Sequence, residues 1–142
     1  MRDPKRLEVL VRWRERGEDA ARRALAEEQA RELRAQEKLQ AERERLQQAK
    51  PFSSSVDHWV MAEFAQTSQR QRVAQAERAL SDQKQVVQTQ VVELRSAREK
   101  AEVMRRLTER AREEVTLDLR RKEIRESDEQ GRIGMILKQR AG

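Results

Sequence analysis

The residues of this sequence that could carry out chemistry are few and poorly placed for catalysis. The single histidine, His58, has neither a cysteine nor a second histidine with which to complete a metal site. Carboxylates are abundant, but on a solvated helix they gain no burial that would tune them for acid–base work. Gly131 and Gly134 do not match a phosphate-binding loop. We therefore expect no enzymatic activity, no cofactor and no bound metal.

The informative spacing in the chain is one of seven residues. Side chains that are apolar, except for Thr108, occur every seven residues. They form a stripe of Val73, Leu80, Val87, Leu94, Ala101, Thr108 and Val115. Such a repeat places side chains on one seam of a long helix, and a seam of this kind is buried only against a partner helix. The chemistry that the sequence predicts is therefore helix–helix recognition.

Composition agrees with a long-helix protein. Of 142 residues, 41% are charged and only 3% are aromatic, and there are four glycines, two prolines and no cysteine. Disorder is the alternative for so polar a chain, but strong helix formers with few breakers favour a coiled coil. The apolar runs are too short to span a bilayer and no signal peptide is evident, so we expect a cytoplasmic protein.

Local signals divide the chain into two helices. Asp3 followed by Pro4 predicts the start of a helix over residues 4–50, which Pro51 ends. Residues 51–54 form the expected loop, and Ser54 with Asp57 resembles a capping box for a second helix over 55–130. Gly131 is the expected stop, before a flexible tail over 131–142. The predicted fold is all-α, an antiparallel coiled-coil hairpin whose second helix is longer.

Two details of the seam stay open. In the first helix Leu25, Leu39 and Leu46 fit a heptad column, but Glu32 occupies the missing place. In the second helix Gln83 follows Leu80 by three residues, and Gln90 repeats that position one heptad later. Such glutamines either lie in the seam and fix its register or lie at its edge.

The unequal helix lengths predict an uncovered surface. If the chain folds back at residues 51–54, position i lies opposite roughly 105 minus i, so that Pro4 faces Ala101. The second helix would then be uncovered from about Glu102 to Gln130. It keeps an apolar stripe there, at Val103, Met104, Leu107, Ala111, Val115 and Leu119. Apolar surface without an intramolecular cover is a candidate docking surface.

Trp59 and Phe64 are two of only four aromatic residues in the chain, and both follow the predicted loop. They either fill the closed end of the hairpin or form an exposed patch for a partner. The exposed patch is considered because aromatic side chains are enriched among the residues that dominate the energy of protein–protein binding.

Three segments together resemble the FliJ family of flagellar type III export proteins and the related YscO-type proteins of virulence secretion systems. They are KRLEVLVRWRERGEDAARRALAEEQ near the N-terminus, SSSVDHWVMAEF after the loop, and RRKEIRESDEQGRIG near the C-terminus. The resemblance implies a hairpin similar to the central stalk of rotary ATPases. It also implies three partners: a hexameric export ATPase, a membrane export gate and export chaperones.

The resemblance also suggests which residues meet these partners. Those expected to face the ATPase are Arg6, Leu7, Leu10, Arg12, Arg16, Arg121, Glu123, Asp128 and Glu129, and the apolar stripe adds Leu107 and Val115. Trp59 and Phe64 are the gate-binding candidates. Two other functions stay open, a structural homo-oligomeric rod and a basic nucleic-acid binder. The net charge of +6 comes from 32 basic and 26 acidic residues in thorough mixture, which does not favour nucleic acid.

Overall fold

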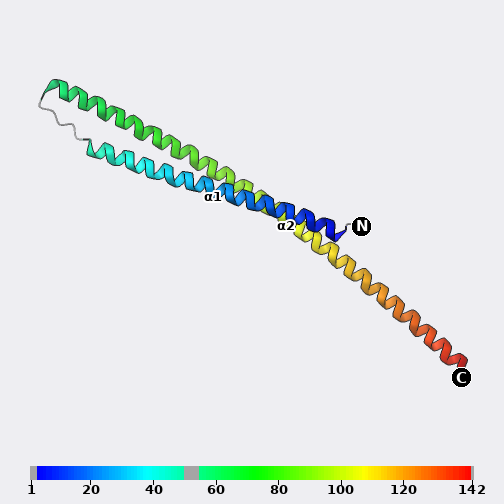
Figure 1. The fold of residues 1–142 in the computed structure, drawn as a ribbon. Coiled ribbons are helices and arrows are strands. Elements are labelled where there is room, and N and C mark those ends of the chain that lie inside the picture. Colours follow the sequence, from blue (N-terminus) through cyan, green and yellow to red (C-terminus); the bar gives the residue numbers. More distant parts are fainter. Residues whose placement is uncertain (1–2, 50–54, 142) are drawn as a thin grey trace. The chain divides into compact units, whose positions relative to one another are not determined.

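The computed structural model describes residues 3–49 and 55–141, and these form two α-helices with no strand among them. Helix α1 spans Pro4–Gln48 and helix α2 spans Val56–Ala141. The two helices run antiparallel, and α2 is the longer, with 86 residues against 45 (Figure 1). The predicted all-α coiled-coil hairpin is confirmed.

Helix α1 begins as the sequence predicts. The Asp3 carboxylate accepts a hydrogen bond from the backbone N–H of Lys5 at 3.0 Å, and the Asp3 carbonyl accepts bonds from the N–H groups of Arg6 and Leu7. These contacts satisfy donors that have no partner within the first turn. Pro4 loses nothing at the first helical position, where its missing N–H would be unpaired.

Helix α2 begins one residue later than predicted, and its N-cap is Ser55. The Ser55 hydroxyl oxygen accepts a hydrogen bond from the backbone N–H of His58 at 3.3 Å and lies 2.7 Å from His58 Nδ1. His58 thus belongs to the helix cap. The predicted loop over 51–54, and Ser54 with it, lies outside the described residues.

The predicted end of α2 at Gln130 is wrong, because the helix continues to Ala141 and includes the segment expected to be a flexible tail. A glycine ends a helix when it adopts the left-handed conformation, and no described glycine has a positive φ. Within a helix a glycine costs only about 1 kcal/mol relative to alanine. Gly131 and Gly134 therefore weaken the helix without breaking it.

The described contacts divide into two units, which we treat separately. The central unit is Gly17–Arg98, and the N-terminal unit combines Met1–Arg16 with Glu99–Gly142. The core of the central unit is formed by the buried side chains of Leu39, Val73 and Ala76, against which Leu46 and Leu80 pack.

The predicted seam of α2 is largely confirmed. Its members Val73, Val87, Leu94, Ala101 and Thr108 are buried and Leu80 is half-buried, whereas Val115 is exposed. The Thr108 hydroxyl donates to the carbonyl of Met104 at 2.8 Å, which satisfies a polar group within the seam.

Polar side chains join the helices at two matching places in the central unit. The Gln69 amide donates to the backbone carbonyl of Glu42 at 3.0 Å and to its carboxylate at 2.5 Å. The Gln83 amide donates in the same way to Glu28, at 3.0 and 2.6 Å. Gln83 therefore lies in the seam rather than at its edge.

Each of these carboxylates also contacts an arginine three residues later on α1. Arg45 lies 3.2 Å from Glu42, and Arg31 lies 2.6 Å from Glu28. The same combination of Glu, Arg and facing Gln thus occurs twice along the helix pair. Sequence reasoning missed the two glutamates, because only their facing residues reveal that they belong to the seam.

The two pairs correct the predicted register. The residue numbers of each facing pair, 42 with 69 and 28 with 83, add to 111 and not to roughly 105. Contacts between the two helices determine which positions face each other. The prediction instead assumed that the chain turns at the centre of the loop, with equal lengths of helix on each side. Gln48, at the end of α1, is then opposite Glu63, so the first two turns of α2 extend beyond α1.

Candidate docking surfaces

In the N-terminal unit, α1 packs on α2 through a short seam of small side chains. Leu7 from α1 and Ala101, Thr108 and Ala111 from α2 are buried. Leu7 was a predicted ATPase contact, but it is only 8% exposed. Its side chain therefore stabilises the helix pair and offers little surface to a partner.

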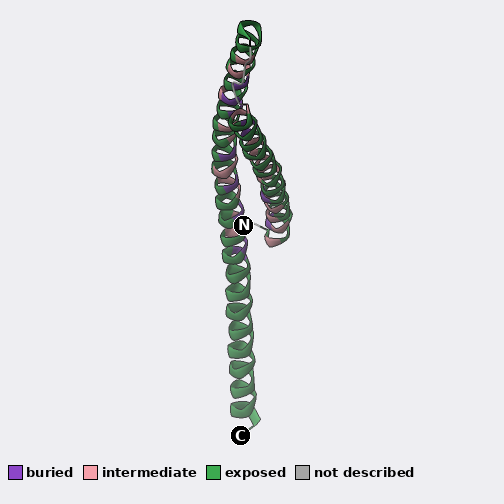
Figure 2. Cartoon of the chain, turned by 90° about the vertical axis from the view of Figure 1, so that its left-hand side faces the viewer, coloured by how far each residue is buried: buried purple, intermediate pink, exposed green. Residues whose placement is uncertain are grey.

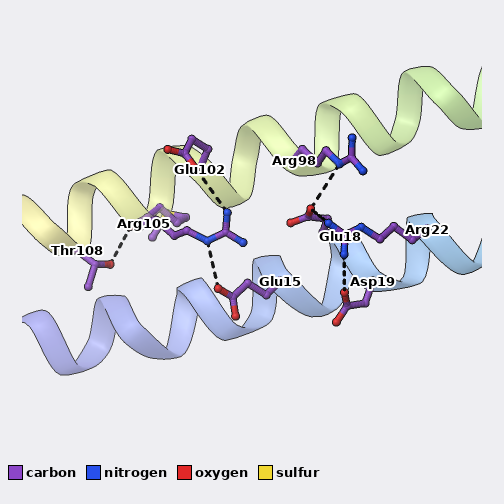
Figure 3. Close-up of polar contacts among 9 residues, drawn as sticks. Glu15, Glu18, Asp19, Arg22, Arg98, Glu102, Arg105 and Thr108 are labelled. Carbon is purple, nitrogen blue, oxygen red and sulfur yellow. Dashed lines mark hydrogen bonds and ion pairs between the residues drawn. The ribbon is translucent and has the colours of Figure 1, made fainter.

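Ion pairs cross between the helices beside this seam. Arg112 pairs with Glu8. Arg105 lies 3.2 Å from Glu15 and 3.5 Å from Glu102 (Figure 3). These groups border an open groove of about 510 Å³, which is lined by Glu8, Val11, Arg12, Arg105, Thr108, Glu109 and Arg112. Arg105 and Arg112 are engaged by carboxylates of the same unit, and Glu8 and Glu109 line the groove as well, so it is not a one-sign surface.

Elsewhere on α1 the N-terminal unit exposes large side chains. Val9, Leu10 and Trp13 are exposed, and the guanidinium of Arg14 lies 4.6 Å from the centre of the Trp13 ring. The predicted contacts Arg6, Arg12 and Arg16 are exposed as well. The structure thus brings Leu10 and these three arginines together on one short helical stretch. Sequence reasoning did not include Trp13, although its size and rarity were a usable signal.

Cover by α1 ends at Ala111. From Arg112 to Ala141 every residue of α2 is exposed, and we call this stretch the uncovered helix (Figure 2). The prediction that cover ends near Glu102 is wrong, because the register of the ion pairs carries α1 about three turns further along α2. Leu107 is accordingly half-buried and Ala111 buried.

The uncovered helix nevertheless carries the kind of surface that was predicted. Val115 is 38% exposed, and Leu117, Leu119 and Ile124 are more so. The charged candidates of the C-terminal motif, Arg121, Glu123, Asp128 and Glu129, all lie on it and are exposed. The ATPase-facing candidates from both ends of the sequence therefore belong to one unit.

The beginning of α2 carries a separate apolar patch in the central unit. Trp59 is 53% exposed and Phe64 is 75% exposed, so these aromatic side chains do not fill the end of the hairpin. Val56, Val60 and Met61 are also exposed, and we call these five residues the start-of-α2 patch. Residues 56–63 of α2 reach beyond the end of α1 and hold four of the five members, and Phe64 follows them directly. Sequence reasoning missed Val56, which continues the four-residue spacing of Val60 and Phe64.

The rest of the described chain offers little else. Across residues 3–49 and 55–141, no group of three or more histidine, aspartate or glutamate side chains is placed to hold a metal ion. None of the helical stretches in that part of the chain carries the long apolar run needed to cross a bilayer. Both candidate surfaces are exposed helix faces.

These features define a two-helix coiled coil with exposed helix faces, a class of protein suited to binding other proteins. The family model described as the flagellar FliJ protein matches residues 4–140, nearly the whole chain. The chain belongs to the FliJ family, whose members are non-enzymatic components related to flagellar export. No characterised protein and no solved structure matches the chain. The family resemblance seen in the sequence is confirmed.

Proposed function

We propose that this protein binds the hexameric ATPase of the flagellar export apparatus through the uncovered helix, in the manner of a central stalk. The observation that carries the proposal is the set of apolar side chains on α2 beyond the reach of α1, which begins with Val115, Leu117 and Leu119. Burying such area against a partner contributes about 25 cal/mol per Å². A surface of this kind on a chain of an export family favours a docking role.

The charged side chains around this stripe would set the approach and orientation of the partner. Arg110, Arg121 and Glu123 are exposed next to it, and Arg6, Arg12 and Arg16 add basic charge from α1 in the same unit. Charges at the rim of an interface chiefly accelerate association and make it sensitive to salt. We expect binding of the ATPase to weaken as the ionic strength rises.

The start-of-α2 patch supports a second contact, with the membrane export gate. Large aromatic side chains at an interface often dominate its energy, and here Trp59 and Phe64 are both exposed. Changing both to alanine should weaken capture of the gate and leave ATPase binding unchanged. Equal losses for both partners would count against two separate surfaces.

Binding of export chaperones belongs to the same proposal and rests on the family alone. A protein with these partners would act in the cytoplasm and reach the membrane only through them. The homo-oligomeric rod is less well supported, because the α2 seam packs against α1 of the same chain. Sedimentation showing a monomer would count further against the rod.

The decisive experiment compares two matched double variants. Val115→Asp with Leu119→Asp places charge on the uncovered helix, and Val92→Asp with Leu33→Asp makes the same changes at exposed positions of the central unit. Both should fold as the parent does, because none of the four side chains is buried. The measured quantities are helicity by circular dichroism, affinity for the purified cognate export ATPase, and stimulation of ATP hydrolysis.

We expect the variant of the uncovered helix to lose binding and stimulation, and the central variant to keep both. If both bind as the parent does, the uncovered helix is not the docking element. If both lose binding equally, the effect comes from added negative charge and not from a particular surface.

A further inference from the structure

The last turns of α2 differ in charge from the helix that leads to them. Between Arg112 and Glu129 acidic and basic residues are mixed, whereas after Glu129 no acidic side chain occurs. Residues 130–141 carry only basic charges, at Arg132, Lys138 and Arg140. We call this stretch the C-terminal segment. It is helical and exposed throughout.

The C-terminal segment is also amphipathic. Ile133, Ile136 and Leu137 follow i, i+3, i+4 spacing, which places them on one face of the helix. All three are exposed, at 57, 49 and 60%. At about 100° per residue, Arg132 lies beside this stripe and Lys138 lies on the far side of the helix. Arg140 follows Ile133 by seven residues and so falls at the C-terminal end of the stripe.

Two glycines lower the intrinsic stability of this helix. A Cβ added at Gly131 or Gly134 would meet no atom within 4 Å, so packing in this chain does not require glycine at either position. Each glycine lowers the helix–coil equilibrium by about fivefold relative to alanine. The apolar stripe receives no support from α1, whose cover ends at Ala111. Binding that buries the stripe would therefore stabilise the helix as well.

We propose that the C-terminal segment is a basic amphipathic helix that lies on an anionic lipid surface. Such helices place an apolar face at the boundary of headgroups and acyl chains while basic side chains meet lipid phosphates and carboxylates. The exclusively basic charge of the segment favours an anionic surface over a neutral one. The C-terminal segment is itself the end of the uncovered helix, and it lies beyond the proposed ATPase-docking residues Val115 and Leu119 and the charged candidates up to Glu129.

The full-length protein and phospholipid vesicles provide the test. Co-sedimentation should show binding to phosphatidylcholine vesicles that contain phosphatidylserine, little binding to phosphatidylcholine alone, and a decrease as salt is added. Ile133→Asp with Leu137→Asp should abolish binding. Arg132→Gln, Lys138→Gln and Arg140→Gln together should weaken it about a hundredfold, because each basic residue near such a surface contributes about fivefold.

A matched triple variant controls for total charge. Arg23→Gln, Lys84→Gln and Arg95→Gln remove the same charges from exposed positions of the central unit and should have little effect. Gly131→Ala with Gly134→Ala should tighten binding several-fold, since the helix is then better formed before it binds.

Three results would overturn the proposal: no binding to anionic vesicles, equal binding to neutral ones, or equal losses for the two triple variants. Binding of the C-terminal segment to an acidic protein groove would appear as the first of these. Because the vesicle assay contains no ATPase, its outcome is independent of the proposed docking function.

Discussion

The polar pairs of the central unit should control both stability and register, and Gln69→Leu tests this most simply. Gln69 makes two hydrogen bonds to Glu42, one to the carbonyl and one to the carboxylate, and both residues are buried. A hydrogen bond to a charged group contributes about 1.5–3 kcal/mol to the stability of the folded protein. Leaving a buried acceptor without a donor lowers that stability by a similar amount. Arg45 still contacts the carboxylate, which limits the loss.

We expect Gln69→Leu to lower the free energy of unfolding by about 1–3 kcal/mol, after the gain from burying leucine is included. Glu42→Leu with Gln69→Leu replaces both polar partners and should restore most or all of that stability, because an apolar pair needs no hydrogen bond. The double variant should also hold the two helices less strictly in a single register, because the polar pair no longer fixes which positions face each other.

Urea denaturation followed by circular dichroism gives the free energies, and the double-mutant cycle isolates the coupling between the two side chains. We expect a coupling of about 1–3 kcal/mol. If Gln69→Leu is as stable as the parent, or if the double variant is no more stable than Gln69→Leu, the pair does not stabilise the hairpin through these hydrogen bonds.

Three further variants test the packing. Leu94→Asp places a charge at a buried seam position and should lower the free energy of unfolding by about 3–5 kcal/mol. Thermal unfolding near the parent's temperature would show that Leu94 does not lie in a buried seam. Glu32→Leu fills the polar gap between Leu25 and Leu39 at a half-buried position and should raise the free energy of unfolding by about 1 kcal/mol in the same denaturation assay. Arg43→Gln removes the 3.3 Å ion pair with Glu77, in which both side chains are half exposed, and should change stability by less than about 1 kcal/mol even at low salt.

The sequence predicted the fold because its signals are local or periodic. The seven-residue stripe identified the buried face of α2, and Asp3 with Pro4 marked the first residue of α1. Both signals depend on geometry within one helix. They could be read before anything was known about the facing helix.

Pairing between the helices was harder to predict, because it is set by contacts far apart in the chain. Glu28 and Glu42 look like ordinary surface glutamates until Gln83 and Gln69 are placed opposite them. In the N-terminal unit the pairs of Glu8 with Arg112 and Glu15 with Arg105 carry the limit of cover to Ala111, so Leu107 proved half-buried. In the central unit the register leaves Trp59 beyond the end of α1.

Site-specific cross-linking can show whether the uncovered helix is the face that meets the export ATPase. The chain contains no cysteine, so Leu119→Cys and Val92→Cys each give a single site for a photoreactive label. Both positions are exposed on α2, one on the uncovered helix and one in the central unit. With the assembled cognate ATPase, we predict a cross-link from position 119 and none from position 92. Cross-linking from 92 alone, or from neither position while the two proteins remain bound, would show that the uncovered helix is not the ATPase-binding face.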